Sequence, residues 1–235
     1  MKRAIWILCA AAAVTACTGV RAEEAKPVEP FNGKDLAGWK PRGDAAKSKW
    51  KVGKAALDAA DPKLLVCGEG GAEMVNVVGG SHGGGVDIIS VEKFGDVHVE
   101  LEVLVAKGSN SGIYLMGEYE IQVLDSFGRE KPGPGDMGGL YGASAPKVNA
   151  SKPHGEWQPY VIDFRAPRFD ASGNKTANAR FVKVVLNGQV LHEDVEMKGP
   201  TGGAISKEVA TGPLMFQGDH GPVAYRNIRI TPLAK

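Results

Sequence analysis

Short runs in which apolar and polar residues alternate recur along nearly the whole chain. In residues 97–103 every second position is apolar, as expected for a strand that buries one face. Similar runs elsewhere lie between glycine- and proline-containing segments, which favour turns. We therefore expect strands at residues 49–52, 64–67, 86–90, 97–105, 112–115, 118–124, 157–164, 179–186, 189–196, 214–217 and 223–231.

The order of these runs predicts an all-β protein. Helical periodicity is nearly absent, and 32 glycines and 14 prolines separate the short apolar runs. Asn187-Gly188 stands between two such runs and is a strong hairpin-turn signal. Many short strands with regular turn signals are typical of a two-sheet antiparallel β-sandwich of the jelly-roll type. The concave face of such a sandwich is a suitable place for a ligand groove.

Residues 118–124 carry the most informative polar pattern. Glu118, Glu120 and Gln122 alternate with apolar residues, so the three polar side chains share one face of the predicted strand. The strand rise places neighbouring members about 6–7 Å apart. Two carboxylates held at that spacing suit acid/base chemistry or metal binding.

The first 30 residues read as an export signal and a tether. Lys2 and Arg3 precede an apolar stretch at residues 4–16, which is shorter than the roughly 20 residues that span a bilayer. Two cleavage sites compete: a bacterial lipobox that ends at Cys17, and a small-residue site that ends at Ala22. The lipobox fits the distance from the charged end better. We expect a signal peptide at residues 1–16, with lipidation at Cys17 and a flexible tether over residues 17–30.

This N-terminus predicts an exported bacterial protein, either free in the periplasm or anchored to a membrane as a lipoprotein. Contact with a membrane would occur only through the lipid. Loss of residues 1–16 lowers Lys+Arg from 28 to 26 against 27 Asp+Glu, a net charge of −1, which gives no reason to expect nucleic acid as a partner. Cys67 is then the one cysteine beyond the lipid site, so no internal disulfide is expected. Residues 31–235 are expected to form a single β-sandwich domain.

An ordered set of short motifs extends over roughly residues 31–232. The motifs are FNGKDLAGW from Phe31, SNSGIY from Ser109, EYEIQVLD from Glu118, GLYG from Gly139, GEW from Gly155, NG at Asn187, QGDHGPV from Gln217 and RNI from Arg226. This set resembles the 3-keto-disaccharide hydrolase domain family. The resemblance implies a sandwich of the concanavalin A-like lectin/glucanase type and cleavage of glycosidic bonds in sugars oxidised at C3. The segment around His220 has one residue more than is usual in the family.

The chemistry of a 3-keto sugar defines what such a site needs. A ketone at C3 makes the C2 proton acidic, so a base can remove it, the C1 substituent can leave, and water can add back. A donor or a divalent cation would stabilise the C3 oxygen. Our candidate catalytic residues are Glu120, His220 and Glu118. Glu120 and His220 are also our candidate ligands for a divalent metal ion. Our candidate carbohydrate-binding residues are Gln122, Asn110, Tyr141, Trp157 and Arg226.

Two other functions remain open from the residues themselves. An ordinary glucanase on this fold commonly has three acidic residues at alternate positions of one strand, whereas here the third position is Gln122. A non-catalytic carbohydrate-binding domain would bind sugar without turnover.

Overall fold

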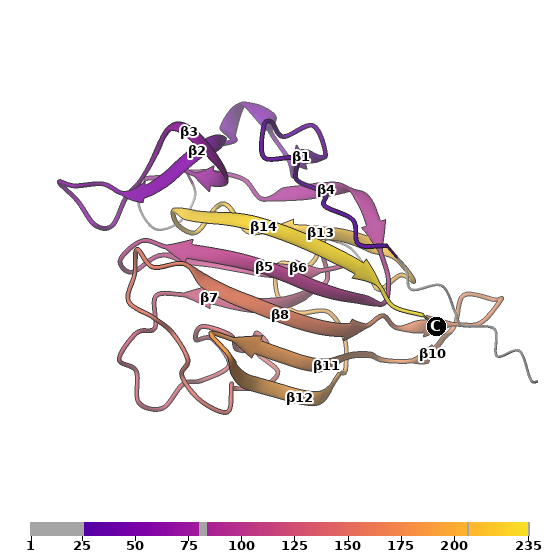
Figure 1. Ribbon diagram of the computed structural model, residues 1–235. Helices are drawn as coiled ribbons and strands as arrows, with labels where there is room; N and C mark the ends of the chain where they lie inside the picture. The colour runs from indigo at the N-terminus through magenta and orange to yellow at the C-terminus, as the bar shows by residue number, and fades with distance from the viewer. Residues whose placement is uncertain (1–25, 80–83, 206, 235) are drawn as a thin grey trace, which may run out of the picture.

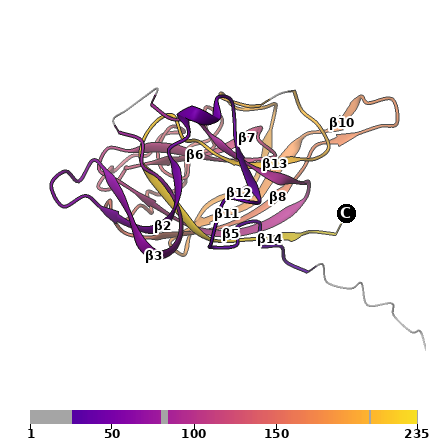
Figure 2. The same ribbon diagram turned by 90° about the horizontal axis from the view of Figure 1, so that it is seen from above.

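The computed structural model describes residues 26–79, 84–205 and 207–234 of the chain. It confirms an all-β sandwich of two large antiparallel sheets. Figure 2 shows the sheets as two layers, with β6, β7 and β13 on one side and β2, β3, β5 and β14 on the other. Cys17, Ala22 and the expected signal peptide lie outside the described residues.

The two sheets differ in size, and their order is visible in Figure 1. The five-stranded sheet runs β1 (Trp39–Pro41), β4 (Ile88–Phe94), β13 (Gly212–Phe216), β6 (Asn110–Leu115) and β7 (Tyr119–Leu124). The seven-stranded sheet runs β12 (Gln189–Met197), β11 (Ala179–Leu186), β8 (Gln158–Arg165), β5 (Val97–Val105), β14 (Val223–Pro232), β3 (Leu65–Asn76) and β2 (Trp50–Leu57). A small hairpin joins β9 (Arg168–Phe169) to β10 (Lys175–Ala177).

Helical structure is nearly absent from the described part of the chain. It contains one short 3-10 turn, η1 (Ala45–Lys47). Asp44 precedes this turn and caps it, because its side chain accepts a hydrogen bond from the Ala46 N–H group. Among these residues we find no helix long and apolar enough to cross a membrane.

Aromatic side chains join the two sheets through the core. Phe216 of β13 stacks on Tyr225 of β14 with ring centroids 3.8 Å apart, and it stacks on Trp39 of β1 at 5.1 Å. All three rings are buried. Offset ring stacking adds to the free energy gained by burying this apolar surface, so the contact fixes the sheets face to face.

Each strand expected from the sequence has a counterpart, and the largest difference is the length of β3. We predicted residues 64–67, whereas the strand continues to Asn76. The sequence did not indicate this longer strand, because several glycines follow Cys67 and glycine usually weakens a strand. Gly71 is required there: a Cβ atom at this position would lie 2.1 Å from the backbone nitrogen of Lys54. Strands β1, β9 and β10 were not expected, because they are short and show no alternation of apolar and polar residues.

The predicted turn between β11 and β12 is confirmed. Asn187 and Gly188 have φ angles of 51° and 79°, as a type I′ turn requires at both central positions. The turn leads Leu186 directly into pairing with Gln189.

Candidate active site

The β6–β7 hairpin positions the polar residues that the sequence singled out. In its register Tyr114 lies opposite Glu120, and Gly112 lies opposite Gln122. Residues opposite each other in an antiparallel pair share one face of the sheet. The four therefore lie on the face that points away from the core, while the alternate residues of β7 pack into the core.

This polar face is covered rather than open to solvent. The Gln122 N–H group donates to the Gly139 carbonyl at 2.8 Å, and the Tyr141 N–H group donates to the Glu120 carbonyl at 3.1 Å. Thr201 also donates, through its N–H group, to the Glu118 carbonyl at 2.9 Å. Two loops thus cover the free edge of β7. The Glu118, Glu120 and Gln122 residues are only 1%, 3% and 4% exposed.

A pocket of about 200 Å³ remains between these loops and the sheet. Its lining combines polar side chains from β6 and β7 with residues of three loops. The lining residues are Asn110, Tyr114, Glu120, Gln122, Tyr141, Gly202, Gly203, Gln217 and His220. The structure therefore brings together five of the side chains that the sequence singled out: Glu120, His220, Gln122, Asn110 and Tyr141.

Glu120 has the electrostatic environment of a proton-transfer group. The pKa of its carboxyl group is raised from 4.5 to about 7, mainly by burial; the nearby Asp87 and Asp219 carboxylates contribute to the rise, and a hydrogen bond with Tyr114 opposes it. Gly112 provides the space for the carboxyl group, because a Cβ atom there would lie 2.4 Å from Glu120 Oε1. A carboxyl group with a pKa near neutrality exchanges protons readily at physiological pH.

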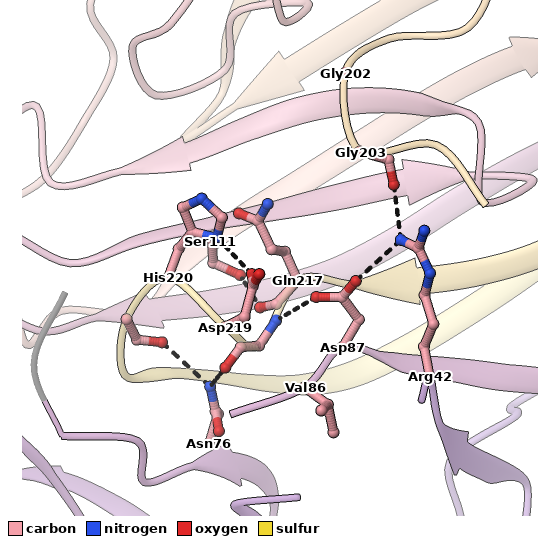
Figure 3. A network of polar contacts seen from close by, with 12 residues as sticks. Arg42, Asn76, Val86, Asp87, Ser111, Gly202, Gly203, Gln217, Asp219 and His220 are labelled. Atoms are coloured by element: carbon pink, nitrogen blue, oxygen red, sulfur yellow. Dashed lines mark hydrogen bonds and ion pairs between the residues drawn. The ribbon is translucent and has the colours of Figure 1, made fainter. Parts of the chain in front are cut away.

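The loop that carries His220 is held by buried polar contacts. Asn76 Nδ2 donates to the carbonyls of Gly218 at 2.9 Å and Gly221 at 3.2 Å. Asp87 Oδ1 accepts the Gly218 N–H group at 2.9 Å. These contacts, drawn in Figure 3, fix the backbone on both sides of His220.

His220 is paired with the carboxylate of the preceding residue. Its Nδ1 atom contacts Asp219 Oδ1. A carboxylate at Nδ1 fixes the orientation of the imidazole ring. His220 lines the same pocket as Glu120, so an imidazole ring and a carboxyl group meet there.

Arg42 links the opposite wall of the pocket to the same network. Its Nη1 atom donates to the Gly203 carbonyl at 2.7 Å and lies 3.2 Å from Asp87 Oδ2. Its Nη2 atom donates to the Ala204 carbonyl at 3.2 Å. Figure 3 shows the guanidinium group between the Gly203 carbonyl and Asp87. Asp87 therefore supports two loops: the loop at residues 202–204, through Arg42, and the loop that carries His220.

Sequence reasoning missed several members of this site: Tyr114, Gln217, Asp219, Asp87 and Arg42. Two of them had a usable signal, because Tyr114 alternates with Gly112 on a predicted strand and Asp219 precedes His220. Arg42 lies in a loop and Asp87 lies just before β4, and no local pattern indicates a role for either residue.

Three other candidates lie outside this pocket. Glu118 is buried beside the turn that precedes β7 and does not line the pocket. Trp157 packs against a separate apolar cluster on the outer face of the seven-stranded sheet. The guanidinium carbon of Arg226 lies 4.0 Å from the centroid of the Trp157 ring, and Arg226 Nε donates to Glu102 at 2.5 Å. The structure therefore separates Trp157 and Arg226 from Glu120.

The pocket offers a cation few protein ligands. Among the described residues no group of three or more His, Cys, Asp or Glu side chains is placed to hold a metal ion. Glu120 and His220 line one pocket, but a cation bound between them would need further ligands from water or substrate. The side chains therefore do not form a complete metal site by themselves.

The sequence profile of the 3-keto-alpha-glucoside-1,2-lyase-like domain matches residues 26–231. The chain belongs to this family. A 3-keto-disaccharide hydrolase from Bacteroides thetaiotaomicron is 33% identical over 101 residues, which are 43% of this chain and 30% of that protein. The match thus spans less than a third of the length of the Bacteroides protein.

Solved structures agree with this family assignment. A crystal structure of a candidate glycosyl hydrolase from Parabacteroides distasonis has a TM-score of 0.67 and 28% identity, over 88% of this chain and 84% of that chain. A second candidate glycosyl hydrolase from the same organism has a TM-score of 0.58 and 18% identity, over 88% and 94% of the two chains, and supports the fold alone. The expected family and β-sandwich are therefore confirmed.

Proposed function

We propose that this protein cleaves the bond between C1 and its oxygen substituent in 3-keto-glycosides, by elimination followed by addition of water. The observation that carries the proposal is the buried Glu120 carboxyl group, with a pKa raised to about 7, in one pocket with the Asp219-paired His220. Family membership supports the substrate class.

In the first step Glu120 acts as the base. Its ionised carboxylate takes the proton from C2, and the electron pair of the C2–H bond forms a C2=C3 double bond as the C3 carbonyl oxygen becomes an enolate. A base works best when its pKa lies near the operating pH, and burial places the pKa of Glu120 there. The Asp87 and Asp219 charges increase its affinity for the proton.

In the second step His220 acts as the acid. The enolate re-forms the C3 carbonyl, the C1=C2 double bond appears, and the C1–O bond breaks. The leaving oxygen takes a proton from Nε2 of the protonated His220. Addition of water across C1=C2 then returns hydrogen to C2 and hydroxyl to C1, so the sum is hydrolysis without net oxidation or reduction.

The enolate oxygen needs a hydrogen-bond donor, and our candidate is the side-chain NH₂ group of Gln122. Its Oε1 atom accepts the Val123 N–H group at 3.1 Å, and the residue lines the pocket. A fixed donor directed at developing negative charge lowers the barrier without reorganisation. Glu120 and His220 remain our candidate ligands if a divalent ion assists; no step above depends on it.

The pocket disfavours the glucanase alternative. Glycosidases that act on unoxidised sugars normally use a pair of carboxylates on either side of the bond. Glu120 is the only carboxylate among the residues that line this pocket in the described structure. Chemistry at C2 of a 3-keto sugar needs one base and one acid, which the pocket provides.

The test compares 3-keto-glucosides with the matching glucosides as substrates. We expect turnover of the oxidised sugars alone, and Glu120→Gln should reduce kcat by about 100-fold or more, the usual scale for losing a general base. Glu118→Gln is the matched control, because it removes a carboxylate on the same strand face outside the pocket, and it should retain most of the activity.

Other outcomes would assign the protein to another functional class. Turnover of unoxidised glucosides would favour a glucanase, and sugar binding without turnover would favour a binding domain. The same assay, repeated after exhaustive chelation and with elemental analysis, tests the divalent ion: unchanged rates and no bound metal would exclude that role.

A further inference from the structure

A second pocket adjoins the first at His220. It has a volume of about 400 Å³ and is lined by Lys63, Lys107, Gly108, Ser109, His220, Gly221 and Pro222. His220 is the one residue that lines both pockets. A substrate that occupied both would therefore place the bond between its two parts beside the imidazole ring.

The two lysines of this pocket come from loops that are joined to each other. The Lys107 N–H group donates to the Pro62 carbonyl at 2.9 Å. The Lys63 N–H group donates to Asp61 Oδ1 at 3.0 Å, which holds the end of the first loop in a turn. Residues 63 and 107 therefore lie on the same side of the second pocket, although they are far apart in the chain.

The side chains of these lysines carry uncompensated charge. Within the described residues, neither ammonium group makes a hydrogen bond or an ion pair. Two carboxylates close in sequence to these lysines make other contacts. Asp61 accepts the Lys63 backbone N–H group, and Asp125 accepts the Gly108 N–H group at 2.8 Å and lies 3.6 Å from His154. The first pocket, by contrast, has Glu120 and no lysine among its lining residues.

We propose that the second pocket binds the leaving group and favours leaving groups that carry a carboxylate. The inference rests on the proposed function, which places the 3-keto ring beside Glu120 and the breaking bond beside His220. The leaving group would then extend over Gly221 toward Lys63 and Lys107. Two lysines among the lining residues attract an anion and favour it over a neutral group of the same shape.

The experiment uses an isosteric pair of substrates, the 4-carboxyphenyl and 4-carbamoylphenyl 3-keto-glucosides in both anomeric forms. We expect the wild-type protein to favour the carboxylate by roughly three- to tenfold in kcat/KM at low ionic strength, the scale of two exposed ion pairs. The preference should shrink as salt is added. Lys63→Ala/Lys107→Ala should abolish it, so that the ratio of kcat/KM for the two substrates approaches one.

A matched variant and a binding measurement complete the design. Lys51→Ala/Lys183→Ala removes two exposed lysines that line neither pocket, so it should keep the preference. Calorimetric titration with the unoxidised 4-carboxyphenyl and 4-carbamoylphenyl glucosides measures binding without turnover. Equal kcat/KM for the two oxidised substrates, or a preference that persists in Lys63→Ala/Lys107→Ala, overturns the inference.

The two proposals fail in different ways. Turnover without a carboxylate preference leaves the proposed function standing and overturns the role of the lysines. Absence of turnover together with lysine-dependent binding of the carboxylate glucoside overturns the proposed function and supports the anion site. Absence of both overturns both.

Discussion

At the scale of single residues, Glu120 shows what it costs to bury a carboxyl group. Burial disfavours its ionised form, so its pKa rises from 4.5 to about 7. The folded protein therefore binds a proton at Glu120 more tightly than the unfolded chain does, and ionisation of this residue destabilises the fold.

This destabilisation predicts a pH-dependent gain in stability for Glu120→Gln. Below pH 4.5 Glu120 is protonated in both states and imposes no penalty, and the penalty is complete once the pH exceeds about 7. The shift corresponds to at most about 3 kcal/mol. Urea unfolding at pH 4 and pH 8 should show the variant close to wild type at pH 4 and more stable at pH 8.

Glu193→Gln is the control for this measurement. Glu193 is exposed, and its contact with Lys147 lowers the pKa of its carboxyl group, so its removal should not stabilise the protein at pH 8. A stability difference for Glu120→Gln that is the same at both pH values would show that Glu120 does not titrate as described.

At the scale of elements, the β6–β7 hairpin places the polar side chains by its register. The pairing of Tyr114 with Glu120 and of Gly112 with Gln122 puts a glycine beside the Glu120 carboxyl group. Loops at residues 138–141 and 201–205 then close the edge of β7 by backbone hydrogen bonds. The hairpin thus positions the candidate catalytic side chains, and the loops bury them.

Gly112→Ala tests whether this close fit matters. The new Cβ atom would lie 2.4 Å from Glu120 Oε1 and 2.8 Å from the Tyr114 ring, so the carboxyl group must move. We expect kcat/KM for a 3-keto-glucoside to fall at least tenfold, because small displacements of a catalytic group are costly. The cost in the free energy of unfolding should be about 1–3 kcal/mol.

Gly199→Ala is the matched control, since its Cβ atom would meet nothing within 4 Å and its φ is not in the left-handed region. It should leave rate and stability close to wild type. Full activity in Gly112→Ala would mean that the position of the Glu120 carboxyl group is not critical.

At the scale of the whole molecule, the sandwich supports a site on the outer face of its smaller sheet. Asn76 of β3 belongs to the seven-stranded sheet, yet it holds the His220 loop beside β6. Arg42 and Asp87 lie next to β1 and β4 and brace the other wall. The site therefore depends on both sheets being assembled.

The sequence also predicts how the whole molecule is placed in the cell. If Cys17 is lipidated, the wild-type protein should sediment with membranes, and Cys17→Ser should move it to the soluble fraction without changing its activity. Cell fractionation and mass analysis of the mature N-terminus measure this. A soluble wild-type protein that begins at Glu23 would instead support the cleavage site after Ala22.

Local periodicity by itself determined the strands and the direction of their side chains. Alternation placed Glu120 and Gln122 on one face of β7, since side-chain direction depends only on the backbone. The Asn187-Gly188 turn was predictable for the same reason, because its φ angles are a property of those two residues. The ordered motifs were sufficient to identify the family.

Only the tertiary structure decided which of these side chains meet. No local pattern shows that loops bury Glu120 and raise its pKa. Nor does one show that Arg42, Asp87 and Asn76 hold loops that lie more than a hundred residues away in the chain. Trp157 and Arg226 looked suited to a sugar site, but they lie on the other sheet. Contacts between distant segments depend on packing across the sandwich, which the pattern of a single segment does not encode.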